Sequence, residues 1–147
     1  MRTMDPSLRA RQFLDGYAAA YLRRDAEAVA AMFAFPSFVV SDSGASLTLV
    51  QNESPAAWRG QVEALFRMYA AIGVARIELA SLGARELSPR LLLVEARWQL
   101  GDAAGGPLYD FDTLYMLGEI DGSLRITSAV SPNELPRYRA CAARLGR

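Results

Sequence analysis

Acid–base chemistry in this protein would have to come from carboxylates and tyrosines. The 147-residue chain contains no histidine, which is the commonest general base and metal ligand in proteins. Its only cysteine, Cys141, cannot form an intrachain disulfide or a zinc cluster, and no histidine is present to activate the thiol. We therefore interpret Cys141 as an ordinary small side chain, and we expect neither a bound metal nor a cofactor.

Asp42 is the first candidate acid, because it lies at the end of a β-rich run in "FVVSDSG", residues 38–44. At the mouth of a pocket its carboxylate could move a proton. We favour a turn instead, since Asp and Ser side chains bond the nearby backbone and Gly44 can adopt a positive φ without steric cost. The pocket acid remains the alternative.

A second pair of carboxylates, Asp110 and Asp112, lies in the alternating run "LYDFDTLYML", residues 108–117. Side chains two residues apart share one face of a strand, and two such carboxylates repel each other unless one is solvated or paired. We favour an exposed pair that an arginine neutralises. The alternative is that Asp112 is an acid with a raised pKa inside a cavity.

Tyr17 is the candidate hydrogen-bond donor. It belongs to an apolar helix face in which residues 13–22 repeat at three- and four-residue spacing. Such a tyrosine is either a core residue whose hydroxyl finds one partner, or a donor that faces a pocket and stabilises a developing oxyanion.

Aromatic side chains recur along the chain at helical and strand spacing. This pattern is typical of an ordinary core, but the same residues could line a hydrophobic cavity. Ser128 lies on an otherwise apolar strand face that includes Leu124, Ile126 and Val130, where it could contact a ligand. The candidate pocket residues are Tyr21, Trp58, Phe66, Tyr69, Trp98, Phe111, Thr113, Tyr115 and Ser128.

Capping signals place the helices. Asp5-Pro6 and Ser54-Pro55 each combine a capping acceptor with a proline in the first turn, and Gly73 is a natural helix end. Asp25 is expected to cap a second helix that runs through Phe33 and stops at Pro36. A short helix is expected at about residues 134–145.

The rest of the chain has the alternation of strands. Two short strands are expected within residues 37–50, and four longer ones follow within residues 74–88, 90–100, 108–117 and 124–131. Short turns join these longer strands, which predicts an antiparallel meander. Helices followed by such a sheet define an α+β fold.

Composition excludes several classes of function. The formal net charge is zero and no basic stripe is present, so we expect no nucleic-acid partner. No apolar run approaches membrane-spanning length, and the first residues lack the apolar core of a signal peptide. We expect a cytoplasmic protein without a membrane partner.

Three segments carry a family resemblance: "YLRRDAEAVAAMFAFPSFVV", "RWQLGDAAGGPLYDFDTLYML" and "DGSLRITSAVS". They resemble the opening helix pair and the last hairpins of the nuclear transport factor 2-like (NTF2-like) superfamily, which includes ketosteroid isomerases and polyketide cyclases. The resemblance covers about residues 8–131. It implies a single domain over residues 1–147, in which helices pack on a highly curved antiparallel sheet to form a cone around a pocket. It also implies a homodimer that pairs through the sheet.

The isomerase members of this superfamily use an oxyanion tyrosine and carboxylates. Aligning Asp25 and Phe33 with the family pattern puts Tyr17 at the tyrosine, but Ser41 rather than Asp42 at the base. Our first hypothesis is therefore a protein with a hydrophobic small-molecule pocket and an incomplete catalytic set. The alternatives are an isomerase or cyclase that uses Tyr17 with Asp42 or Asp112 on a hydrophobic carbonyl compound, and an interaction module that uses its sheet face.

Overall fold

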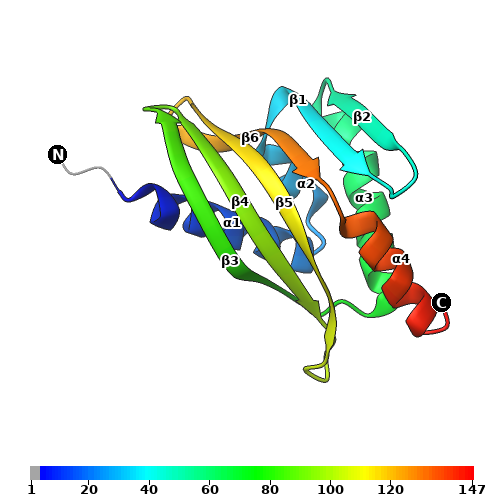
Figure 1. Cartoon of the computed structure of the whole chain (residues 1–147). Coiled ribbons are helices and arrows are strands. Elements are labelled where there is room, and N and C mark those ends of the chain that lie inside the picture. Colours follow the sequence, from blue (N-terminus) through cyan, green and yellow to red (C-terminus); the bar gives the residue numbers. More distant parts are fainter. Residues whose placement is uncertain (1–3) are drawn as a thin grey trace.

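The computed structural model describes residues 4–147, and its elements follow the predicted order of helices and strands. The C-terminal helix lies beside the third helix at one end of the curved sheet (Figure 1). The elements are α1 (Pro6–Leu22), α2 (Ala26–Ala31), β1 (Phe33–Asp42), β2 (Leu47–Asn52), α3 (Pro55–Ile72), β3 (Arg76–Ser88), β4 (Leu91–Gly101), β5 (Pro107–Ile120), β6 (Ser123–Ser131) and α4 (Glu134–Arg144).

Side-chain caps fix the starts of α1, α2 and α3, as the sequence predicted. The carboxylates of Asp5 and Asp25 accept hydrogen bonds from the backbone N–H groups three residues on, and the Ser54 hydroxyl does the same for α3. These bonds satisfy N–H groups that have no partner inside the helix. At its other end α3 stops at Gly73, whose φ of 76° is the left-handed conformation that glycine adopts without penalty.

The second helix is shorter than the sequence indicated. It ends at Ala31, and Phe33 already belongs to β1 instead of the helix. The Phe33 side chain is buried and packs against Trp58 with the ring centres 5.0 Å apart. Burial of this strand residue against α3 therefore outweighs the local helical preference of the segment.

The six strands form one sheet in the order β2-β1-β6-β5-β4-β3. Neighbours pair antiparallel except β1 and β6, which run parallel. The prediction of a wholly antiparallel sheet is therefore wrong at this pair. The chain leaves β2, passes through α3 and the β3–β5 meander, and only then lays β6 beside β1, so the pairing depends on contacts far apart in sequence.

An irregularity in β6 changes which of its side chains face the helices. Leu117 pairs with Ile126 and Met116 with Ser128, so one extra residue is accommodated between the two pairs. A bulge of this kind breaks the alternation of a strand. Ile126 and Ala129 are both buried, whereas Ser128 lies on the opposite face from Ala129. The prediction that Ser128 shares the face of Ile126 is wrong for this reason.

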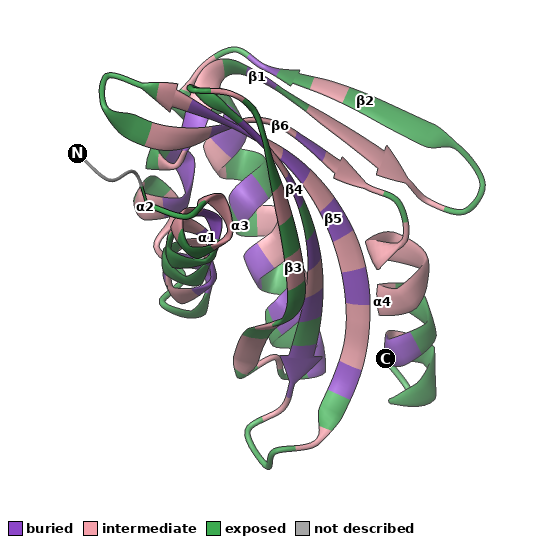
Figure 2. Cartoon of the chain, turned by 60° about the vertical axis from the view of Figure 1, so that its left-hand side comes forward, coloured by how far each residue is buried: buried purple, intermediate pink, exposed green. Residues whose placement is uncertain are grey.

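The core lies between the helices and the inner face of the sheet. Buried residues alternate with less buried ones along β4 and β5, and α1 and α3 cover the side on which they point (Figure 2). In residues 4–147, no helix has both the length and the apolar character needed to cross a membrane. The fully buried large side chains of this core include Leu14, Val29, Phe33, Val62, Val94, Leu100, Leu117 and Ile126.

Substitutions at Leu14 and Leu8 test how much the packing of α1 against this core contributes to stability. Leu14 has none of its surface exposed, whereas Leu8 on the same helix is 47% exposed. Leu14→Ala is expected to lower the free energy of unfolding by about 2–5 kcal/mol, because it removes buried methyl groups and leaves a cavity. Leu8→Ala should cost less than about 0.5 kcal/mol. Urea denaturation measures both, and equal losses would contradict the packing described.

Candidate functional site

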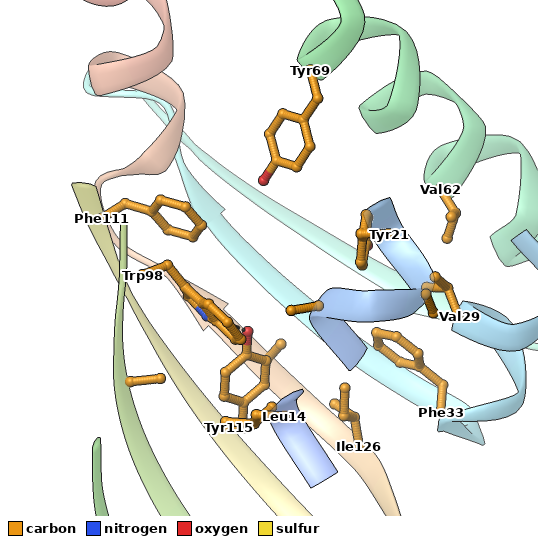
Figure 3. Packing of buried hydrophobic residues seen from close by; sticks show 14 of the residues in the cluster. Leu14, Tyr21, Val29, Phe33, Val62, Tyr69, Trp98, Phe111, Tyr115 and Ile126 are labelled. Atoms are coloured by element: carbon orange, nitrogen blue, oxygen red, sulfur yellow. Dashed lines mark hydrogen bonds between the residues drawn. The ribbon is translucent and has the colours of Figure 1, made fainter. Parts of the chain in front are cut away.

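The inner face of the sheet and the helices line a partly open cavity of about 130 Å³. Figure 3 shows the side chains of Trp98, Phe111 and Tyr115 on the sheet side, with Tyr21 and Tyr69 across from them on α1 and α3. Most of the wall is apolar. The cavity is lined by Tyr17, Ala18, Tyr21, Phe33, Val39, Trp58, Leu65, Tyr69, Ile77, Trp98, Phe111, Thr113, Tyr115, Ala129, Ser131 and Glu134.

The structure brings most of the predicted pocket residues together at this cavity. Phe66 is an exception, because it lies behind Tyr21, with the ring centres 5.5 Å apart, and lines a neighbouring hollow. Ser128 is the other exception and faces the opposite side of the sheet. The predicted residues that line the cavity are Tyr17, Tyr21, Trp58, Tyr69, Trp98, Phe111, Thr113 and Tyr115.

Tyrosine hydroxyls supply much of the polar surface of the cavity. The Tyr17 hydroxyl donates to that of Tyr21 over 3.2 Å. Trp98 Nε1 donates to the Tyr115 hydroxyl over 2.9 Å, and Figure 3 shows these two side chains together. Burial raises the pKa of Tyr17, Tyr21 and Tyr115 above the ordinary tyrosine value. These hydroxyls therefore stay protonated and act as neutral hydrogen-bonding groups.

Asp42 shapes the β1–β2 turn and does not line the cavity. Its Oδ1 accepts a hydrogen bond from the Gly44 N–H over 2.8 Å, and Gly44 has a φ of 90°. The Ser43 hydroxyl accepts from the N–H groups of Ala45 and Ser46. The favoured prediction of a turn agrees with these bonds, and they place Asp42 away from the site where a catalytic acid would act.

Asp110 and Asp112 point to the outer face of β5, away from the cavity. Arg97 Nε lies 3.0 Å from Asp112 Oδ1, and Arg97 Nη1 lies 3.0 Å from Asp110 Oδ2. Hydrogen bonds from Arg97 and Asn133 lower the pKa of Asp112, so its carboxylate stays ionised. The alternative of a cavity acid with a raised pKa is therefore wrong for Asp112, because strand alternation turns its side chain outward.

Glu134 is the carboxylate that lines the cavity, and the sequence offered no signal for it. Its Oε2 accepts hydrogen bonds from the Tyr69 hydroxyl over 2.6 Å and from the Tyr109 hydroxyl over 2.8 Å. Burial raises the pKa of Glu134, while these two bonds oppose the increase. An acidic residue in the first turn of a helix is common for local reasons alone, so only the tertiary structure reveals this environment.

Hydrogen bonds from the outer face of β5 fix the start of α4, and this position lets the Glu134 side chain reach the cavity. Asn133 Oδ1 accepts from the Asp112 N–H over 2.9 Å, and Asn133 Nδ2 donates to Asp112 Oδ2 over 2.8 Å. Arg137 donates to the Asp110 carbonyl over 2.9 Å. On the other side, the Tyr138 hydroxyl donates to the Met68 carbonyl of α3 over 2.7 Å. Asp112 is thus a positioning residue for the segment that carries Glu134.

Trp58 provides a further polar group at the cavity wall. The residue is 8% exposed, and its Nε1 has no hydrogen-bond partner within residues 4–147. Buried donors normally have a partner, so this unpaired indole N–H is an exception, and it belongs to a residue that lines the cavity. Spacing along a helix could identify Trp58 as inward-facing, but not its free N–H.

The fold agrees with that of known proteins. The family described as "NTF2-like protein (DUF6841)" matches residues 6–134, and the chain belongs to this family. None of the curated proteins matches the chain.

Solved structures from several bacteria share the fold. An NTF2-like protein of unknown function from Shewanella oneidensis has 18% identity and a TM-score of 0.62, over 83% of this chain and 94% of that chain. Aln2 from a Streptomyces species has 18% identity and a TM-score of 0.69, over 90% and 94%. A protein of unknown function with a cystatin-like fold from Nostoc punctiforme has 11% identity and a TM-score of 0.68, over 88% and 92%. At these identities the likeness concerns the fold alone.

The half-buried position of Glu134 should make stability depend on pH in a defined direction. A carboxyl whose pKa is raised on folding stabilises the protein fully below its unfolded pKa, and this contribution is lost as pH rises through the folded pKa. Glu134→Gln keeps an acceptor for the tyrosines but cannot ionise. The variant should therefore gain stability relative to the wild type as pH rises above the ordinary value of 4.5. Denaturation between about pH 4 and 8 measures the difference; a constant difference, or the opposite slope, would refute the description of Glu134.

Proposed function

We propose that the protein binds a small, largely apolar organic molecule of about one ring in its cavity. The observation that carries this proposal is the aromatic wall, since eight of the sixteen lining residues are Phe, Tyr or Trp. An apolar cavity of about 150 Å³ is large enough for benzene. The present volume of about 130 Å³ is similar, so a single substituted ring fits better than a multi-ring compound.

The free Trp58 N–H supports an oriented ligand. Its Nε1 has no partner within residues 4–147 and the residue lines the cavity. A ligand oxygen that accepts this hydrogen bond would satisfy a buried donor whose unpaired state costs free energy. This is the usual design of small-molecule sites, in which an apolar wall provides affinity and a few polar groups fix orientation.

Catalysis of the isomerase kind has weaker support. It requires a carboxylate that faces the same cavity as Tyr17. Glu134 meets this condition, but its Oε2 is held by the hydroxyls of Tyr69 and Tyr109. Both candidates from the sequence lie elsewhere. Asp42 bonds its own turn, and Asp112 pairs with Arg97 on the outer face. We therefore propose a binding function and assign no reaction to these residues.

Benzyl alcohol is a suitable first probe, because it combines one ring with a hydroxyl oxygen. Titration is expected to change the fluorescence of Trp58 and Trp98, which both line the cavity. Ala129→Leu fills part of the cavity and should weaken binding by about tenfold or more, equivalent to about 1.4 kcal/mol.

Ala143→Leu is the matched control, since Ala143 is exposed on α4. It should leave the affinity for benzyl alcohol unchanged. Circular dichroism establishes that both variants fold. Absence of benzyl alcohol binding to the wild type, or unchanged binding by folded Ala129→Leu, would count against the proposed function.

We also propose that two copies pair through the outer face of the sheet. Leu49, Val40, Val130 and Leu114 lie in cross-strand register on this face, and Leu49 is 77% exposed. The other three side chains are half-buried, and a contiguous apolar patch with accessible surface is typical of an interaction surface. The same face carries charges of both signs, including Arg97 and Asp110, so a second copy offers complementary partners.

Light scattering tests this pairing directly. The wild type is expected at twice the mass of the chain at micromolar concentration, and Leu49→Arg should shift it to the single-chain mass. Leu8→Arg, at an exposed leucine on α1, is the control and should remain paired. A monomeric wild type would refute pairing and would leave the sheet face available to a different protein.

A further inference from the structure

The cavity contains a carboxylate and lacks a positive charge. Of its lining residues, Glu134 is the one that can carry a charge at neutral pH, and no arginine is among them. Within residues 4–147, Glu134 forms no ion pair, and two of the arginines on its own helix bond elsewhere. Arg137 reaches the Asp110 carbonyl and Arg144 the Leu108 carbonyl. An ionised carboxylate in this position is stabilised by hydroxyl groups alone, and buried charges are normally paired.

One oxygen of Glu134 is still available. Both tyrosine hydroxyls donate to Oε2, from Tyr69 on α3 and from Tyr109 on β5. Among the described residues nothing donates to Oε1. Two tyrosine hydroxyls thus hold the carboxylate in one orientation and leave a free acceptor on a group that lines the cavity.

The surroundings of this acceptor are aromatic. The negative charge of Glu134 contributes to the pKa increases that burial causes in the surrounding tyrosines, so these groups lie within electrostatic reach of it. The faces of Tyr and Trp rings attract organic cations, and several rings arranged around one site form the aromatic cage that recognises ammonium groups. The tyrosines concerned are Tyr17, Tyr21, Tyr69, Tyr109 and Tyr115.

We infer that the preferred ligand of this cavity is a small organic cation of the arylalkylammonium class. Its ammonium group donates to Glu134 Oε1, and its ring or alkyl part packs against the aromatic wall. This inference rests on the proposed function, since it specifies the charge of the molecule that the cavity binds. An ammonium ion supplies the positive charge that the cavity lacks, whereas a carboxylate ligand would meet Glu134 with repulsion.

Three probes with the same ring and different charge test the inference. Benzylammonium, benzyl alcohol and benzoate are titrated by calorimetry at about pH 7.5 into the wild type. Benzylammonium is expected to bind at least about tenfold more tightly than benzyl alcohol, from combined cation–π and charge-assisted hydrogen bonding. Benzoate should bind more weakly than both.

Glu134→Gln separates charge from shape. It should reduce the affinity for benzylammonium to about that for benzyl alcohol and should lessen the exclusion of benzoate. Glu63→Gln is the matched control, because Glu63 is exposed on α3 and does not line the cavity. It should keep the wild-type order. Glu134→Asp retains the charge on a shorter side chain and should keep a reduced preference for the cation, which provides a test if Glu134→Gln does not fold.

The outcomes distinguish the two proposals. If benzyl alcohol binds and benzylammonium binds no more tightly, the cation inference is overturned and the proposed binding function stands. If Glu134→Gln folds and keeps the wild-type preference for benzylammonium, the role of Glu134 is overturned. If none of the three probes binds, the proposed function fails as well.

Discussion

The carboxylate of Glu134 links three separate elements through a single oxygen. Its Oε2 accepts hydrogen bonds from Tyr69 of α3 and Tyr109 of β5, while the residue itself begins α4. Removing a carboxylate from water is unfavourable unless hydrogen bonds replace the lost solvent. The arrangement therefore requires α3, β5 and α4 to meet at one place, and that meeting forms one side of the cavity.

Both faces of strand β5 contribute to the site: one lines the cavity and the other positions α4. On the inner face Phe111, Thr113 and Tyr115 line the cavity, whereas on the outer face Asp112 holds Asn133 at the start of α4. Because side chains alternate along a strand, a slip of one residue would turn the carboxylates inward and the aromatic rings outward. The register of β5 against β4 and β6 is thus a condition for the cavity as well as for the sheet.

Membership of an NTF2-like family does not by itself define what the cavity does. The fold positions helices over a curved sheet, and the chemistry depends on which side chains reach the space between them. In this chain the space contains aromatic rings, a tryptophan N–H without a partner in residues 4–147, and one carboxylate held by tyrosines. These groups favour recognition of an oriented small molecule. Asp42, Asp110 and Asp112, the carboxylates that the sequence singled out, are not among them.

Local interactions determined what could be read from the sequence. The helix caps at Asp5 and Ser54 and the turn at Asp42 depend on neighbours within a few residues, so their signals are contained in short segments. Alternation along β5 likewise separated the aromatic face from Asp110 and Asp112. The tertiary structure decided the parallel pairing of β1 with β6, the bulge that turns Ser128 away, and the position of Glu134. Each of these depends on residues that are distant in the chain, and Glu134 acquires its partners Tyr69 and Tyr109 only when three elements pack together.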